Sequence, residues 1–262
     1  MTAADRPRPG RPVILALGWL GLIFLLAPLA VVFPVSLTPE RYLSMPSGGI
    51  SFQHYAKLVT DLRWSSSILT SLAIAALTTV FATALGTLCA IGLWRLGGTW
   101  TRYLRIMILA PLIVPPIVHA LAFYRTWIDL NWLDTLMGVV VAHTIICIPL
   151  VLITVSTSLS GFDRRLEQAA RSLGAPPATV LRRIVLPNIA PGILSGAAFS
   201  FVTSWDEVVA VLFLTSRKVV TLPIVIWNSL TERVDPAVAA VSAVMILATL
   251  IAVVVRLVAG KA

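Results

Sequence analysis

The chain has 262 residues, of which 58% are hydrophobic and only 12% are charged, and its mean hydropathy is +0.94. Soluble domains are nearer to half apolar and a quarter charged, so this composition indicates a membrane protein and argues against a disordered chain. The net charge of +9 is spread over too few charged residues to form a groove for nucleic acid. Cys89 and Cys147 both lie within apolar runs, which argues against a disulfide framework or a metal cluster.

Six apolar stretches approach or exceed the roughly 20 residues that a helix needs to cross a bilayer. They predict an all-α membrane protein with six transmembrane helices, at Val13–Leu37, Ser67–Trp94, Ile106–Tyr124, Leu136–Ser158, Gly192–Leu214 and Pro236–Val255. The remaining residues form short loops and ends, so residues 1–262 are predicted to be a single transmembrane domain.

The distribution of Lys and Arg predicts the orientation of these spans. With residues 1–12 as a cytoplasmic tail, the inner segments contain most of the basic residues and few acids, whereas the outer segments are nearly balanced. Both termini are therefore predicted to be cytoplasmic. The inner basic residues are Arg6, Arg8, Arg11, Arg95, Arg102, Arg105, Arg164, Arg165, Arg171, Arg182, Arg183, Arg256 and Lys261.

The first span follows three arginines and resembles a signal peptide in that respect. Its apolar run is longer than the 7–15 residues of a signal sequence, and no clear A-x-A cleavage site follows it. We interpret it as a membrane anchor that is retained.

Small residues and prolines predict local features of the spans. Ala82, Gly86 and Ala90 recur every four residues and predict a close approach between helices. Asp235 followed by Pro236 is a typical start for the last span. The segment Leu222–Leu230 is too short to cross and is predicted to be interfacial or re-entrant. A break or kink is expected in the third span at Pro111, Pro115 and Pro116.

The motifs of several enzyme classes are missing from the sequence. It contains no G-x-x-x-x-G-K-[ST] phosphate loop, and no H-E-x-x-H, G-x-S-x-G or C-x-x-C pattern. We therefore predict that the chain is not an enzyme, that it has no catalytic or metal-binding residues and that it binds no cofactor itself.

The inner loop of residues 159–191 is the most informative segment. Leu166, Ala169, Ala170 and Leu173 have helical spacing, and Gly174 stands where a helix-ending glycine belongs. A second helix is expected to follow Pro176 and Pro177 and to stop at Pro187. Amphipathicity alone leaves two interpretations open: the segment is held by a cytosolic partner, or it lies on anionic membrane lipid.

This loop closely resembles the EAA loop in the permease subunits of binding-protein-dependent ABC importers. The matching residues, at the spacing of that pattern, are Ala169, Ala170, Gly174, Ile184, Leu186 and Pro187. Gln168 stands where the pattern usually has Glu, and Glu167 supplies a neighbouring acid. The resemblance implies that these eight residues couple the chain to an ATPase.

Further segments resemble the same family, most of all the second permease subunit of spermidine/putrescine importers. They are 51–55, 204–209 and 222–227. The resemblance implies the type I importer fold in a bacterial inner membrane. It also implies four partners or partner sets: a second permease subunit, two ATPase subunits that bind ATP and Mg, an external solute-binding protein and membrane lipid.

Asp206 and Glu207 are the only acids within a predicted span. A charge there costs at least about 2.5 kcal/mol, so each carboxylate needs water or a partner. On a continuous helix, one polar side would hold Ser200, Thr203, Ser204 and Glu207, with Asp206 at its edge. Two interpretations stay open: these residues line an aqueous path, or the acids pair with a cation on a neighbouring helix.

Two carboxylates on a path suit a cationic solute, and Trp205 would add a cation–π wall if it turned inward. The resemblance implies a permease subunit that forms half of a solute pathway, and together with the sign of this charge it predicts a polyamine as the solute. The alternatives are the same architecture with another solute, such as an opine or another organic cation, a self-sufficient secondary carrier, and a membrane-embedded enzyme. A carrier is expected to show a pseudo-repeat or a proton relay, and neither is found.

Overall fold

The computed structural model describes residues 11–259, without the side chains of residues 11, 12, 233, 252, 253 and 255–259. Residues 1–10 of the predicted tail 1–12 and the side chains of Arg6, Arg8, Arg11, Arg256 and Lys261 therefore lie outside the described part. Every regular element in residues 11–259 is a helix, which confirms the all-α prediction. The chain divides into two compact units, Met1–Ser65 with Ile226–Ala262, and Ser66–Val225.

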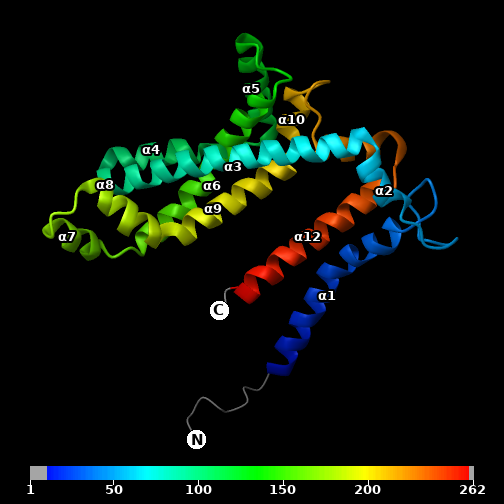
Figure 1. Cartoon of the computed structure of the whole chain (residues 1–262), viewed down its shortest axis with the longest axis horizontal. Coiled ribbons are helices and arrows are strands. Elements are labelled where there is room, and N and C mark those ends of the chain that lie inside the picture. The colour runs from blue at the N-terminus through cyan, green and yellow to red at the C-terminus, as the bar shows by residue number, and fades with distance from the viewer. Residues whose placement is uncertain (1–10, 260–262) are drawn as a thin grey trace, which may run out of the picture. The chain divides into compact units, whose positions relative to one another are not determined.

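The first unit is built from helices at the two ends of the chain. Helix α1 (Arg11–Ser36) packs along α12 (Ala237–Ala259), and the short α2 (Gln53–Thr60) also packs against α12. Figure 1 shows α1 and α12 side by side, although they are far apart in the sequence. The π-helical turn η4 (Ser229–Arg233) precedes α12.

The segment after α1 is tied back by residues at the start of α2. The Tyr55 hydroxyl lies 2.6 Å from Ser36 Oγ, and Gln53 Nε2 donates to the carbonyl of Pro39 at 2.7 Å. His54 Nε2 lies 3.1 Å from the carbonyl oxygen of Glu40. The segment 51–55 thus closes the loop that follows the first span.

Asp235 begins α12 as predicted, because its Oδ1 accepts a hydrogen bond from Ala237 N at 3.0 Å. Its Oδ2 also pairs with Lys57 Nζ of α2 at 2.5 Å. Burial acts to raise the pKa of Asp235, but the hydrogen bonds from Lys57 and Ala237 outweigh it and leave the pKa below its ordinary value.

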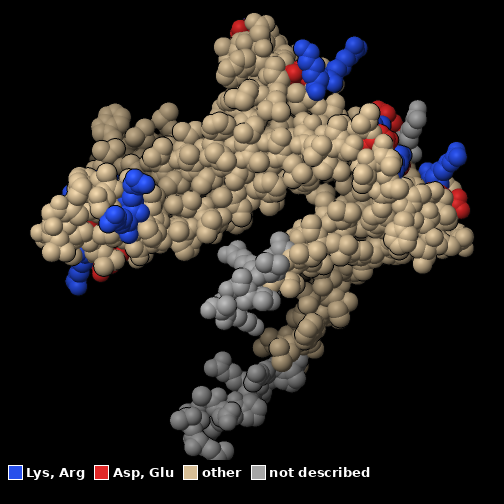
Figure 2. All heavy atoms as spheres, in the orientation of Figure 1, with Lys and Arg blue, Asp and Glu red and all other residues tan. Residues whose placement is uncertain are grey.

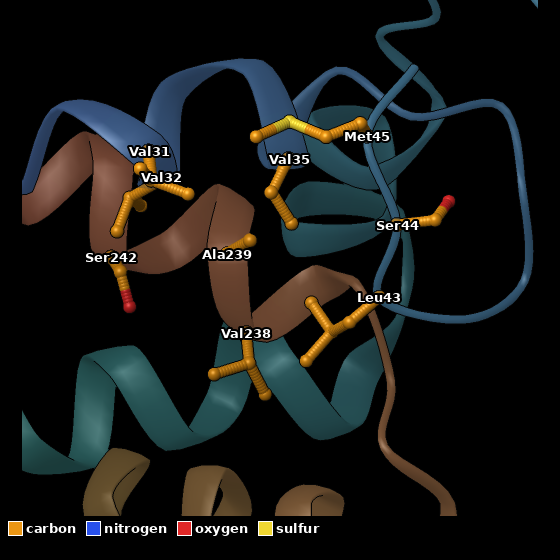
Figure 3. Close-up of a pocket in the computed structure, with 9 residues that line it drawn as sticks. All are labelled: Val31, Val32, Val35, Leu43, Ser44, Met45, Val238, Ala239 and Ser242. Carbon is orange, nitrogen blue, oxygen red and sulfur yellow. The ribbon is translucent and has the colours of Figure 1, made fainter. Parts of the chain in front are cut away.

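An open apolar hollow of about 390 Å³ lies in this first unit (Figure 3). None of its lining residues is charged, so it offers no group that would recognise a charged solute. The hollow is lined by α1, α12 and the intervening loop through Val31, Val32, Val35, Leu43, Ser44, Met45, Val238, Ala239 and Ser242.

The second unit contains most of the remaining helices. Its best-packed pair is α6 (Leu136–Ser160) with α9 (Leu186–Asp206), and α5 (Pro116–Leu130) packs against α10 (Val209–Leu214). The other elements are most of α3 (Leu62–Leu96), α4 (Thr99–Leu109), η2 (Ala110–Leu112), α7 (Arg164–Ser172), α8 (Pro177–Val180), η3 (Leu181–Val185) and the start of α11 (Leu222–Asn228).

The small-residue stripe of α3 packs as predicted. Ala82 and Ala90 are fully buried in the apolar core that also includes Val151 of α6. A Cβ atom added to Gly86 would lie 2.6 Å from the Cβ of Val151, so a larger residue has no room there. The absence of a side chain at Gly86 therefore allows α3 to approach α6 closely.

Four helices in the described part are long and apolar enough to cross a membrane: Val13–Ser36, Leu62–Leu96, Leu136–Ser160 and Pro177–Asp206. The helices Thr99–Leu112 and Pro116–Leu130 form a fifth candidate, bent by 98°. This bend confirms the predicted proline break, because Pro115 and Pro116 lack the N–H groups that would continue the helix. A shorter apolar helix covers Ala237–Ile251.

The fifth predicted span, Gly192–Leu214, differs from the observed helices. The helix begins at Pro177 and ends at Asp206, and a separate short helix, α10, follows after Glu207 and Val208. The expected stop at Pro187 is also wrong. A π-helical turn at Leu181–Val185 precedes this proline, and Pro187 lies in the first turn of α9, where its missing N–H breaks no hydrogen bond of α9, so the helix continues.

Charged side chains of the second unit gather at its two ends on the face shown in Figure 2. One group lies over α7 and α8 and the other lies beside α10, with uncharged atoms between them. A charge-free band between charged ends is typical of a protein whose helices cross a membrane. The chain is a multi-pass membrane protein.

Candidate functional site

Helix α7 is a short helix with both ends capped. Asp163 Oδ1 accepts a hydrogen bond from Arg165 N at 2.9 Å at its start. At its end, Gly174 has a φ of +82°, as expected for a helix-ending glycine. Gly174 N donates to the carbonyl of Arg171 and Ala175 N to that of Ala170, which together make a Schellman motif. A side chain at Gly174 would strain this left-handed turn.

The two faces of α7 differ in exposure. Gln168 and Ala169 are exposed, whereas Ala170 is half-buried and packs against the apolar core of the second unit. Leu173 is 88% exposed, and Leu166, seven residues earlier and on the same side of the helix, is also exposed. Leu166 and Leu173 thus form an exposed apolar knob on this short, capped helix.

Glu167 does not lie on this exposed face. Its side chain is only 12% exposed, and its Oε1 pairs with Arg171 at 2.7 Å and with Arg95 of α3 at 3.7 Å. Its carboxylate therefore has cationic partners within the chain, and Gln168 is the polar neighbour that faces outward.

The second arm of the loop runs directly into α9. Ile184 and Leu186 are half-buried against the same apolar core as Ala170, while Pro187 is exposed. Beside this arm lies a hollow of about 370 Å³, lined by Ala178, Thr179, Arg182 and Arg183. The structure thus places the predicted coupling residues on one continuous feature, with Ala170, Ile184 and Leu186 inward and Gln168, Ala169, Gly174 and Pro187 outward.

The polar side of α9 faces α6. Ser200 is fully buried and Ser204 is nearly so, and Ser204 Oγ lies 2.8 Å from Nδ1 of His143. Cys147 Sγ lies 3.6 Å from the carbonyl oxygen of Ser200. Gly192 and Gly196 continue this side of α9, and a Cβ added to Gly196 would meet Thr154 Oγ1 at 2.7 Å. Ser200 and Ser204 therefore belong to a tightly packed seam between α6 and α9.

The other predicted pathway residues lie near the end of α9. Asp206 is exposed, whereas Thr203, Trp205 and Glu207 are half-buried. Glu207 Oε1 accepts a hydrogen bond from Ala210 N at 2.9 Å and so caps the first turn of α10. Trp205 stacks on Phe201, with ring centroids 6.1 Å apart. Since the helix breaks after Asp206, the six residues do not form one continuous stripe.

Sequence reasoning missed a clamp around Asp134. Its carboxylate accepts hydrogen bonds from the Ser216 hydroxyl and from four backbone N–H groups, those of Ser216, Arg217, Lys218 and Val219. Burial acts to raise the pKa of Asp134, but these backbone donors outweigh it and hold the pKa well below its usual range. The partners lie more than 80 residues away, so no local pattern marks the clamp.

Residues 82–261 match a protein family described as "Binding-protein-dependent transport system inner membrane component". The chain is 30% identical to the spermidine/putrescine transport system permease protein PotC of Haemophilus influenzae. The aligned 231 residues cover 88% of this chain and 90% of that protein. It is 33% identical to a "probable molybdenum ABC transporter permease protein" of Haloferax volcanii, over 84% of this chain and 82% of that protein.

The fold is also similar to that of a solved transporter chain. A chain of a bacterial ABC transporter involved in the import of the acidic polysaccharide alginate superposes with a TM-score of 0.75, at 16% identity and over 99% of each chain. At this identity the likeness shows the fold alone.

Proposed function

We infer that this chain, which belongs to the family of inner-membrane components of binding-protein-dependent transport systems, forms half of the solute pathway of an ATP-driven importer. The observation that carries this proposal is α7, a capped helix with an exposed apolar knob in the inner loop that resembles the EAA loop. The other half of the pathway belongs to a second permease subunit, and an external binding protein delivers the solute.

In this proposal the chain crosses the inner membrane six times. The spans are α1, α3, the bent pair α4–α5, α6, the helix Pro177–Asp206 and α12. Both termini are cytoplasmic, because this orientation places Arg95, Arg164, Arg165, Arg182 and Arg183 on the inner side. The loop 159–191 is then cytoplasmic as well.

ATP and Mg bind to two partner ATPase subunits. In the proposal, the ATPase covers Leu166 and Ala169 of α7 and Leu173 directly after it, all of which are exposed. Covering these side chains is favourable because it removes exposed apolar surface from water. Glu167 pairs with Arg95 and Arg171 of the same chain, and its role in this proposal is to stabilise α7 and its position beside α3.

We propose a polyamine as the solute. Two arguments support it: the resemblance to the spermidine/putrescine permease of Haemophilus influenzae, and the presence of Asp206 and Glu207, whose negative charge suits a cation. The similarity to the molybdenum relative favours a second candidate, an oxyanion. The charge of the two acids opposes an anion, so polyamine remains the first choice.

Reconstitution of the complete transporter tests this function. The complex of both permeases, the ATPase and the binding protein is placed in proteoliposomes, and uptake of labelled spermidine, putrescine and molybdate is measured with and without internal ATP. The proposal expects ATP-dependent uptake of a polyamine and none of molybdate. Uptake of molybdate alone contradicts the polyamine proposal, and uptake by this chain without an ATPase contradicts the importer proposal.

A further inference from the structure

The first turn of α7 is joined to the last turn of α3 by a set of contacts, here called the α3–α7 joint. It consists of Trp94 and Arg95 from α3 with Phe162, Arg164 and Glu167 from the inner loop. Arg164 Nη2 donates to the carbonyl of Trp94 at 3.2 Å, and its guanidinium carbon lies 4.6 Å from the centroid of the Trp94 ring.

Two further contacts reinforce this pair. The ring of Phe162 packs edge-on against the ring of Trp94, with centroids 5.8 Å apart and an interplanar angle of 76°. Arg95 Nη2 lies 3.7 Å from Glu167 Oε1. The joint therefore combines an aromatic pair, a cation–π contact, a hydrogen bond to the backbone and an ion pair.

The chemistry of Arg164 suits this position. The last carbonyl groups of a helix lack partners within the helix and carry partial negative charge, which favours a cation there. The planar guanidinium satisfies the carbonyl of Trp94 and lies over the ring of the same residue, and an ammonium cannot match this combination of planar contact and hydrogen bond.

The joint links segments that are 70 residues apart in the sequence. Helix α7 is also attached by the short turns that lead to α6 and α8, by contacts with α8 and η3, and by Ala170, which packs against the apolar core. The joint adds a polar and aromatic connection between the first turn of α7 and the last turn of α3 to this apolar packing. With it, the first turn of α7 and the end of a membrane-crossing helix move together.

We propose that Arg164 is a positioning residue that passes the displacement of α7 by the ATPase directly to α3. This inference rests on the proposed function of α7 as the element held by the ATPase. Arg164 touches neither ATP nor solute in this role, and it sets how much solute moves for each ATP hydrolysed.

The test compares three variants in the complete reconstituted transporter: Arg164→Ala, Arg164→Lys and the matched control Arg165→Ala, whose side chain is exposed on the same helical turn. Complex yield, ATP hydrolysis and labelled spermidine uptake are measured on the same preparations. Arg164→Ala is expected to lower uptake per ATP by about tenfold, a size typical of coupling between distant sites. Arg164→Lys is expected to recover part of it, and Arg165→Ala to match the unchanged chain.

Two outcomes overturn the proposal. Unchanged uptake per ATP in Arg164→Ala shows that the joint passes no displacement, and a loss of complex yield that accounts for all the lost uptake shows a structural role only. The variant Leu173→Asp tests separately whether the ATPase holds α7, and so distinguishes a failure of the Arg164 proposal from a failure of the proposed function. If α7 is held by the ATPase, Leu173→Asp reduces ATPase co-purification whatever Arg164→Ala does.

Discussion

Ser204 Oγ on α9 and Nδ1 of His143 on α6 lie 2.8 Å apart, with both side chains buried. This hydrogen bond holds Ser204 of α9 against another helix of the same chain. In this chain, then, Ser204 is a packing residue of the α6–α9 seam.

The variant Ser204→Ala is expected to destabilise the second unit. It leaves His143 Nδ1 buried without its partner, which costs about 1–3 kcal/mol. Thermal unfolding of the purified complex in detergent measures this loss, and Thr203→Ala, at a half-buried neighbour, is the control. A Ser204→Ala complex with unchanged unfolding and reduced polyamine uptake would instead place Ser204 on the pathway.

Two glycines of α3 are expected to respond differently to the same change. Gly86→Ala places a Cβ atom 2.6 Å from the Cβ of Val151, whereas Gly92→Ala meets no atom within 4 Å. Gly86→Ala is therefore expected to cost about 1–3 kcal/mol through overpacking, and Gly92→Ala to be neutral or slightly stabilising. Thermal unfolding of the two variants, side by side, checks this difference, and equal values would contradict the close packing of α3 on α6.

Asp206 and Glu207 are expected to act separately. Asp206 is exposed, so Asp206→Asn is expected to slow polyamine uptake and to leave the yield of complex unchanged. The Glu207 carboxylate accepts a hydrogen bond from Ala210 N at the start of α10. Glu207→Ala is therefore expected to lose about 1 kcal/mol of stability, in the range of a lost helix cap. Glu207→Gln keeps an acceptor oxygen and is expected to restore that stability.

Yield and uptake are measured together for these three variants. If Asp206→Asn lowers the yield as much as the uptake, then Asp206 pairs with a buried cation on a neighbouring subunit. Breaking such a pair costs about 3–5 kcal/mol.

Leu173 is expected to contribute to partner binding and little to folding, because its side chain is 88% exposed. Leu173→Ala is expected to weaken ATPase association by about fivefold or more, the effect of losing more than 1 kcal/mol at an interface. Co-purification with the ATPase measures it. The control is Leu194→Ala, at an exposed leucine on α9 outside the α7 loop, and equal effects of the two changes would argue against an ATPase contact at α7.

The Asp134 clamp is expected to weaken in acid. The pKa of Asp134 is lower in the folded chain than its ordinary value of 3.8. The clamp therefore stabilises the folded chain fully at pH values above 3.8, and this contribution is lost as the pH falls towards the folded pKa. Hydrogen exchange of residues 216–219, compared at pH 7 and pH 3, measures this after correction for the intrinsic rates. Asp134→Asn is expected to lose protection already at pH 7, and unchanged protection would contradict the clamp.

The sequence by itself determined the features that depend on neighbouring residues. The left-handed turn at Gly174, the break at Pro115 and Pro116 and the start of α12 at Asp235 all follow from backbone chemistry within a few residues. Hydropathy likewise determined the membrane class, because the cost of burying polar groups in lipid acts on each segment separately.

Only the tertiary structure decided how side chains separated by many residues meet. Glu167 turns to Arg95, Ser204 faces His143, and Asp134 holds residues 216–219, and in each case the partner lies more than 60 residues away. Helical periodicity shows which residues share a face but not which surface covers that face. The continuation of the helix through Pro187 also depended on context, since the π-helical turn before it accommodates the missing N–H. These arrangements arise from packing between helices, which no local pattern encodes.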